Sequence, residues 1–126
     1  MGNYLTFATQ IIMIDIQQQS EFEQVINQND LVFADFYTTW CEPCKILDQV
    51  LDRISDDIPE GMQMVRLDSD MFPELAERLL IKSAPVLFVF KKGEPVWRMN
   101  GFMMDRELID TLHKVSRETD PGDSKN

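Results

Sequence analysis

Apolar and polar residues follow two different periods along the chain, and the change between them marks the predicted elements. Apolar runs with the length of a strand, rich in β-branched and aromatic residues, predict β-strands. These runs cover residues 11–16, 31–37, 62–67, 86–90 and 95–100. The run LVFADFY at 31–37 is apolar at nearly every position, which is typical of a central strand covered on both faces.

Between the runs, apolar residues recur at intervals of three and four, which predicts helices with one buried face. A capping box formed by Ser20 and Glu23 is expected to open the first helix. Asp70 is expected to cap a short helix with Pro73 in its first turn, and a last helix is expected over 105–117. The inward residues of the helix after the cysteines are expected to be Ile46, Leu47, Val50, Leu51 and Ile54.

The elements therefore follow the order βαβαβαββα. This alternation predicts an α/β fold, with a central mixed sheet flanked by helices on both faces and closed by an antiparallel hairpin. We expect one domain over 11–118, preceded by an N-terminal extension over 1–10. The polar and acidic residues of 119–126 predict a flexible tail.

Composition narrows the possible partners. Hydrophobic residues make up 44% and charged residues 27% of the 126-residue chain, as is ordinary for a soluble domain. The 22 acidic residues outnumber the 12 basic ones, which disfavours nucleic acid and anionic lipid as partners. No apolar run reaches the roughly 18 residues of a membrane span. The start of the chain lacks the charged region and cleavage site of a secretory signal, so we expect a cytoplasmic protein.

Both cysteines of the chain, Cys41 and Cys44, lie in the stretch FADFYTTWCEPCKIL. They could bind a metal, form an inert crosslink, or cycle between dithiol and disulfide. A structural zinc site needs four ligands from Cys and His. The chain offers these two cysteines and one histidine, His113, so we expect no metal unless two copies share a site. A crosslink over so short a loop would add little stability.

The redox interpretation explains where the two cysteines stand. Cys41 follows a buried strand and opens a helix, where unpaired N–H groups and the helix dipole favour a thiolate. Cys44 lies about one turn later, close enough to resolve a mixed disulfide, and Pro43 suits the first helical turn. A strand, a C-x-x-C and a helix in this order predict a thiol–disulfide exchange site. No bound cofactor is required, because the cysteines carry the electrons.

The combination of WCEPCK, preceded by ADFY and followed from residue 83 by SAPVLFVFKKGEPVWRMNG, resembles the thioredoxin family. The resemblance covers about residues 11 to 118. It implies the thioredoxin fold and a protein-disulfide oxidoreductase that reduces disulfides in client proteins and serves cell redox homeostasis. It also implies a thioredoxin reductase-type electron donor as a partner. We expect a monomer.

The resemblance assigns catalytic roles to three residues. Cys41 would be the exposed nucleophile and Cys44 the buried resolving thiol. Asp35 matches the family's buried acid; burial raises the pKa of a carboxyl, which could then accept and return the proton of Cys44. The alternative, a tolerated polar residue at a strand edge, is disfavoured by the apolar neighbours of Asp35. Arg66 lies where the family commonly has a lysine, and its cation would offset part of the rise.

The resemblance also implies a docking surface. Pro85 matches the family's cis-proline, which would place the backbone of Ala84 beside the disulfide to pair with an extended client strand. The alternative is an ordinary proline at the start of a strand. An apolar surface for clients would be lined by Trp40, Pro43, Ala84, Gly101 and Phe102, with Met103 and Met104 extending it.

Two positions depart from the family's pattern. Glu42 replaces the usual glycine, and a carboxylate beside the thiolate should favour the disulfide form. The alternative is that Glu42 is simply a favourable residue for the first turn of a helix. Lys45, in the same motif, is expected to modulate the pair. Gln49 replaces the proline that usually kinks the helix, so we expect a straighter helix.

Two other functions are compatible with the same fold. One is an interaction or chaperone module without turnover, which the intact cysteine pair, Asp35 and Pro85 argue against. The other is an oxidase or isomerase of an oxidising compartment, where a histidine before the second cysteine would be favoured instead of Pro43.

Overall fold

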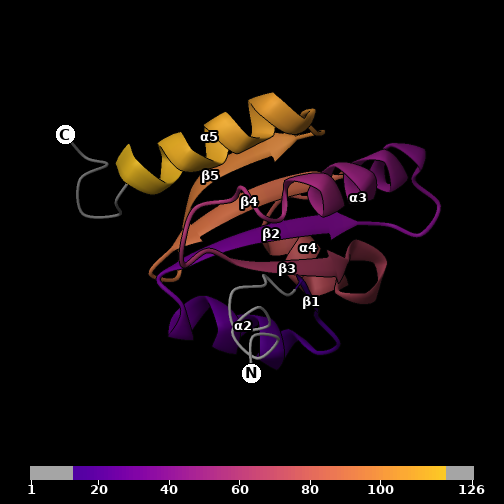
Figure 1. Cartoon of the computed structure of the whole chain (residues 1–126). Helices are drawn as coiled ribbons and strands as arrows, with labels where there is room; N and C mark the ends of the chain where they lie inside the picture. The colour runs from indigo at the N-terminus through magenta and orange to yellow at the C-terminus, as the bar shows by residue number, and fades with distance from the viewer. Residues whose placement is uncertain (1–12, 119–126) are drawn as a thin grey trace, which may run out of the picture.

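The computed structural model describes residues 13–118, which form a central sheet between two layers of helices (Figure 1). The elements follow the predicted order, with an added 3₁₀ turn: β1 (Met13–Asp15), α2 (Gln19–Gln28), β2 (Leu31–Tyr37), α3 (Glu42–Ile54), β3 (Gln63–Asp68), η1 (Ser69–Met71), α4 (Pro73–Arg78), β4 (Val86–Lys91), β5 (Glu94–Asn100) and α5 (Asp105–Glu118). The predicted extension over 1–10 and the tail over 119–126 lie outside the described residues, so the predicted limits of the domain stay a prediction.

The sheet has five strands in the order β1-β3-β2-β4-β5. Strand β3 pairs in parallel with β1 and β2, whereas β4 pairs antiparallel with β2 and β5. The mixed sheet and its closing hairpin are therefore confirmed. Strand β2 lies at the centre, as its apolar sequence predicted, and its five inner residues are all buried.

The two faces of the sheet have separate cores. Helices α3 and α5 cover one face, where their buried residues pack with Phe33 of β2 and Leu87 of β4 (Figure 1). Helices α2 and α4 cover the other face and pack with Ala34 and Phe36. Because successive residues of a strand point to opposite faces, Asp35 shares the face of Phe33, beneath α3 and α5.

The predicted capping box at Ser20 and Glu23 is wrong. Helix α2 begins two residues earlier than that box requires, with Gln18 as its N-cap and no side-chain hydrogen bond from that residue. Glu21 reaches back instead, accepting a hydrogen bond of 2.9 Å from the backbone N–H of Gln17. Glu21 and Glu23 could each accept a hydrogen bond from the backbone at the start of the helix. Because the helix starts early, Glu21 is the one that does so.

The predicted cap at Asp70 is also wrong. The side chain of Asp68 caps the 3₁₀ turn Ser69–Met71, accepting a hydrogen bond of 3.0 Å from the backbone N–H of Asp70. Helix α4 then starts at Pro73. The chain turns into η1 before it reaches α4, so the aspartate that ends β3 becomes the cap. The carboxylate of Asp70 accepts a hydrogen bond from Trp40 instead.

Helix α3 runs over 13 residues without interruption, as expected for a helix without a proline at Gln49. Its buried stripe consists of Cys44, Leu47, Val50, Leu51 and Ile54. Ile46 was expected to point inward but is 46% exposed, because it lies beyond the edge of this stripe.

Candidate active site

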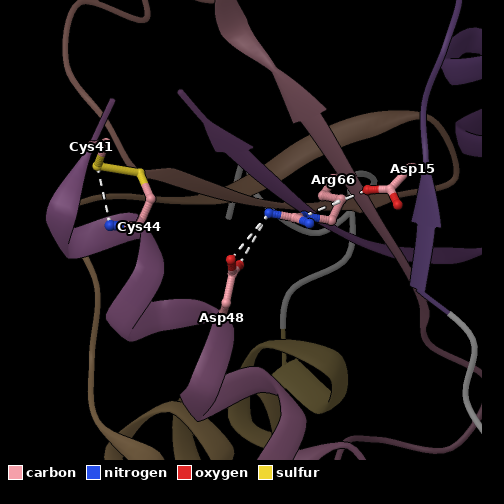
Figure 2. A network of polar contacts seen from close by, with 5 residues as sticks. All are labelled: Asp15, Cys41, Cys44, Asp48 and Arg66. Carbon is pink, nitrogen blue, oxygen red and sulfur yellow. Dashed lines mark hydrogen bonds and ion pairs between the residues drawn. A yellow bond between two sulfur atoms is a disulfide. The ribbon is translucent and has the colours of Figure 1, made fainter. Parts of the chain in front are cut away.

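The two cysteines are joined as a disulfide at the start of α3 (Figure 2). Cys41 is the N-cap of the helix, and its sulfur accepts a hydrogen bond of 3.1 Å from the backbone N–H of Cys44. Pro43 occupies the first turn, where its missing N–H costs nothing. The predicted placement of the motif at a helix N-terminus is therefore confirmed, and the free N–H groups there can stabilise a thiolate.

The expected contrast in exposure between the two cysteines is wrong for the disulfide form. Cys41 is 4% exposed and Cys44 is 3% exposed. The Cys41 sulfur is bonded to Cys44 and turned toward the N–H of that residue, which keeps it close to the helix. Trp40, the residue before the pair, is 70% exposed.

Asp35 is buried where the sequence predicted, with 0% of its surface exposed. Within the described residues, neither oxygen of its carboxyl has a hydrogen-bond partner. Burial raises the pKa of Asp35 to about 7, while the cation of Arg66 lowers this pKa and the charge of Asp48 raises it. Arg66 thus offsets part of the rise, as expected, and leaves a carboxyl that can exchange a proton near neutral pH.

Arg66 stands opposite Asp35 in the register between β2 and β3, but its guanidinium binds other groups. Its Nη2 atom lies 3.1 Å and 3.3 Å from the two carboxylate oxygens of Asp48 (Figure 2). The Nε atom lies 3.6 Å from a carboxylate oxygen of Asp15, and the guanidinium carbon is 4.2 Å from the centre of the Tyr37 ring. The cation is therefore fixed on three sides.

Asp48 is a site residue that the sequence analysis missed. It lies four residues after Cys44 on α3, and residues with this spacing share one face of a helix. Burial raises the pKa of Asp48, and the neighbouring Arg66 opposes that rise. A carboxylate four residues from a buried cysteine was the signal that could have identified it.

The peptide bond between Ala84 and Pro85 is cis, so the predicted geometry at this proline is confirmed. The Pro85 carbonyl accepts a hydrogen bond of 2.8 Å from the backbone N–H of Gly101. Gly101 has a φ of +115°, a conformation that favours glycine. This bond places the start of β4 beside the end of β5.

Only part of the predicted docking surface forms one groove. Trp40 and Ala84 both line a groove of about 610 Å³, together with residues of η1 and α4. The indole N–H of Trp40 donates a hydrogen bond of 3.1 Å to Asp70 across this groove. Phe102 packs against the core beneath α3 and α5, and neither Pro43 nor Gly101 is among the described residues that line the groove.

Arg98 binds the segment that leads into one wall of this groove, although the sequence did not single it out. Its guanidinium donates hydrogen bonds to the carbonyls of Leu79 and Leu80, the latter at 2.6 Å. It also lies over the ring of Phe88, 5.1 Å from the ring centre. These carbonyls follow the end of α4 and lead into residues 81–84, which line the groove.

Glu42 is paired, which the sequence analysis did not foresee. Its carboxylate lies 3.1 Å from the ammonium of Lys45, and their side chains are 80% and 61% exposed. The spacing of three residues along a helix was the available signal. The positive charge of Lys45 therefore offsets part of the negative charge of Glu42 at the start of α3.

Three further findings concern metal binding, His113 and membrane-spanning helices. Within 13–118, no three His, Cys, Asp or Glu side chains are grouped so that they could hold a metal ion. The ring Nε2 of His113 lies 2.7 Å from the carbonyl oxygen of Asp57. No helix in this range is both long and apolar enough to cross a lipid bilayer.

Comparison with known proteins agrees with this geometry. The family model described as Thioredoxin matches residues 13–114. The "Thioredoxin-like protein slr0233" of Synechocystis sp. is 38% identical over 81 residues, covering 64% of this chain and 77% of that protein. The oxidised thioredoxin of Plasmodium falciparum, solved in solution, is 32% identical with a TM-score of 0.73, covering 82% of this chain and 97% of that one.

A longer relative contains the same domain as one part. The "Bifunctional thioredoxin reductase/thioredoxin" of Mycobacterium leprae is 34% identical over 104 residues, which are 82% of this chain. The chain spans 23% of that protein. The match to the family, the mixed five-stranded sheet and the bonded C-x-x-C pair agree. The chain therefore belongs to the thioredoxin family, has the thioredoxin fold and is a protein-disulfide oxidoreductase.

Proposed function

We propose that the chain is a protein-disulfide reductase that cycles Cys41 and Cys44 between dithiol and disulfide and contributes to cell redox homeostasis. One observation carries the proposal: the bonded pair opens α3, directly after the strand that holds the buried carboxyl of Asp35. A nucleophile, a resolving thiol and a proton acceptor are thereby held by adjoining elements.

In the first step, the thiolate of Cys41 attacks one sulfur of a client disulfide. A bond forms between Cys41 and the client, the client's own disulfide bond breaks, and the departing client sulfur takes up a proton. The N–H of Cys44 already points at the Cys41 sulfur, at 3.1 Å in the disulfide form. The same N–H stabilises the thiolate in the reduced form.

In the second step, the carboxylate of Asp35 accepts the proton of the Cys44 thiol. The Cys44 thiolate attacks the Cys41 sulfur, a bond forms between the two cysteines, and the bond between Cys41 and the client breaks. The second client sulfur leaves as a thiolate and takes up a proton from solvent. Two electrons have then passed from the cysteine pair to the client. A carboxyl whose pKa is raised by burial to about 7 suits this transfer, because a base works best near the operating pH.

The proposed partners are disulfide-containing clients and a thioredoxin reductase-type donor that restores the dithiol. The backbone beside the cis bond at Ala84, together with the groove that Trp40 lines, suits an extended client segment. The printed name of the Mycobacterium leprae relative joins a reductase and a thioredoxin in one protein, which supports a reductase as donor. A monomer in the cytoplasm stays our prediction, to be tested by gel filtration and cell fractionation.

Reduction of insulin disulfides with dithiothreitol as the electron source tests the proposal. The wild-type protein should accelerate insulin precipitation, and Cys41→Ser should abolish the acceleration. Cys44→Ser should form a mixed disulfide with the client through Cys41 and fail to release it. A wild-type protein that binds insulin without reducing it would indicate an interaction module instead. Alkylation of Cys44 alone by iodoacetamide at neutral pH would reverse the two assigned roles.

A further inference from the structure

In the polar network beside the cysteines, several carboxyl groups lie near a single cation, the guanidinium of Arg66. Arg66 lies between the carboxylates of Asp48 on α3 and Asp15 on β1 (Figure 2). The same arginine is the register partner of Asp35 in the neighbouring strand. Neighbouring strands lie roughly 5 Å apart, so side chains on one face of such a pair are close neighbours. One guanidinium therefore has three carboxyls around it.

The structure shows which carboxyls hold the cation. Asp48 accepts from Nη2 of Arg66 with both of its oxygens, at 3.1 Å and 3.3 Å. Within the described residues, both oxygens of Asp35 lack a hydrogen-bond partner. An ionised carboxyl buried without donors would gain greatly from such a cation. The cation is therefore bound by Asp48 and makes no hydrogen bond with the buried acid.

We propose that Asp48 is a positioning residue that holds Arg66 away from Asp35 and so preserves the ability of Asp35 to exchange a proton with Cys44. The proposal rests on the proposed function, in which Asp35 serves the second step. Arg66 bound directly to Asp35 would stabilise the carboxylate. Such a carboxylate is a weaker base toward the Cys44 thiol, and resolution of the mixed disulfide would slow.

The charged groups around Asp35 come from several elements. Arg66 faces it from β3 and Asp48 from α3, and these two charges act on it in opposite directions. Asp15 on β1 holds the far side of Arg66, and Tyr37 lies two residues along β2, beneath the guanidinium. Strand β4 contributes the apolar Leu87 opposite Asp35. Loss of Asp48 would remove a like charge and the hydrogen bonds that hold Nη2 of Arg66, and both changes would stabilise the Asp35 carboxylate.

Titration of the Asp35 carboxyl by carbon-13 NMR in the oxidised protein tests the inference without turnover. The wild-type midpoint should lie near 7. Asp48→Asn should lower it by about one pH unit or more, as an opposite charge within a few ångströms does. Asp48 is 42% exposed at its side chain, so the variant should fold, and Asp48→Ala provides a second variant.

Asp52→Asn is the matched control, because it removes the same charge from the next turn of α3. Asp52 is exposed, borders the same hollow as Arg66, and makes no ion pair with it in the described part of the chain. In the Asp52→Asn variant, the titration midpoint of Asp35 should shift by at most about a third of the shift that Asp48→Asn causes, because solvent screens an exposed charge. Equal shifts in both variants would overturn the proposal.

An Arg66→Gln background distinguishes two ways in which Asp48 could act on Asp35, by positioning Arg66 or by direct charge repulsion. Arg66→Gln should raise the Asp35 midpoint, since it removes the cation. In that background only the repulsion between Asp48 and Asp35 remains, so Asp48→Asn should shift the midpoint at least twofold less than it does in the wild type. Equal shifts in the two backgrounds would contradict the positioning role.

The pH dependence of insulin reduction links the inference to activity. Asp48→Asn should move the acidic limb to lower pH and lower the plateau rate by roughly threefold, as expected for a weaker base. The two hypotheses fail separately. A wild-type protein without insulin reduction would refute the proposed function, whereas an unmoved Asp35 titration in Asp48→Asn would refute only the positioning role.

Discussion

The two faces of the central sheet are built from the same strands but differ in what they bury. The face beneath α2 and α4 holds five buried phenylalanines. Four of them, Phe22, Phe36, Phe88 and Phe90, form four ring pairs whose centres lie 5.5 to 6.0 Å apart. The face beneath α3 and α5 holds the carboxyl of Asp35 among its apolar residues.

One face of the sheet therefore contributes mainly to stability, and the other carries the groups proposed for the chemistry. Aromatic rings that pack edge to face or stacked, as these do, add to the stability that their burial provides. A carboxyl without hydrogen-bond partners costs stability when it ionises. The fold therefore tolerates an unfavourable group on the face that carries the cysteines, while the opposite face is packed with apolar side chains.

The largest expected effect is a loss of stability from a substitution on the phenylalanine-rich face beneath α2 and α4. Phe22 on α2 is 2% exposed and contacts two other rings. Phe22→Ala should lower the free energy of unfolding by about 3–5 kcal/mol, because it leaves a cavity in the core. The midpoint of the pH dependence of insulin reduction should not move. Urea unfolding and that pH profile check both parts, and a shifted midpoint would show that the faces are not separate.

Asp35→Asn should stabilise the protein at neutral and alkaline pH. The pKa of Asp35 is raised in the folded state from 3.8 to about 7. Below about pH 4 the carboxyl is protonated in both states and costs nothing, whereas between pH 4 and 7 only the unfolded chain loses the proton. Stability therefore falls as pH rises through this window, and the full cost above it is at most about 4 kcal/mol.

Urea unfolding of both proteins at several pH values checks this prediction. The Asp35→Asn variant should lack this part of the pH dependence, so its stability relative to the wild type should increase from about pH 4 and reach its full gain above about pH 7. If the variant were instead less stable at every pH, Asp35 would have a structural role that its missing hydrogen bonds do not reveal.

A smaller effect is expected at the wall of the groove. Arg98→Met removes the donors to Leu79 and Leu80 and should loosen residues 81–84. Ordering a loop side chain costs about 0.5–1.5 kcal/mol, so the KM for insulin should rise roughly three- to tenfold with little change in kcat. Arg106→Met, which loses only an exposed pair with Asp110, is the control. A fall in kcat at constant KM would place Arg98 in the chemistry instead.

The smallest effect is expected at Glu42. Lys45 lies 3.1 Å from its carboxylate, so Glu42→Gln alone should shift the reduction potential by no more than about 10 mV. In a Lys45→Gln background the field of Glu42 is unopposed, and the same change should shift the potential further toward oxidising values. Equilibration with glutathione buffers measures both. Equal shifts in the two backgrounds would show that Lys45 does not oppose Glu42.

The sequence predicted those features that depend on a local pattern or on the family motif. The order of elements, the central position of β2 and the helix start at Cys41 follow from periodicity and turn residues, and the structure confirms them. The burial of Asp35 and the cis bond at Pro85 followed from the resemblance and are also confirmed. Their roles in catalysis and docking stay predictions.

The features that the sequence did not predict depend on proximity in space. Asp48 and Arg66 lie 18 residues apart in the chain, and Trp40 and Asp70 lie 30 apart. Nothing in either segment alone indicates its partner. The cap at Ser20 was mispredicted for a different reason, because neighbouring polar residues offered alternative helix starts that differ by little energy. Cys41 is 4% exposed in the disulfide form, and the sequence alone does not specify that form.

The rate at which the mixed disulfide is resolved, measured against pH, tests most directly the claim that Asp35 serves the chemistry of the cysteines. The mixed disulfide between Cys41 and a labelled cysteine-containing peptide is mixed rapidly into buffers from pH 5 to 9, and release of the peptide is followed over time. In the wild type the rate should rise through a midpoint near 7. Asp35→Asn should lose this inflection and resolve the complex more slowly across the range. An identical profile in both proteins would contradict the account.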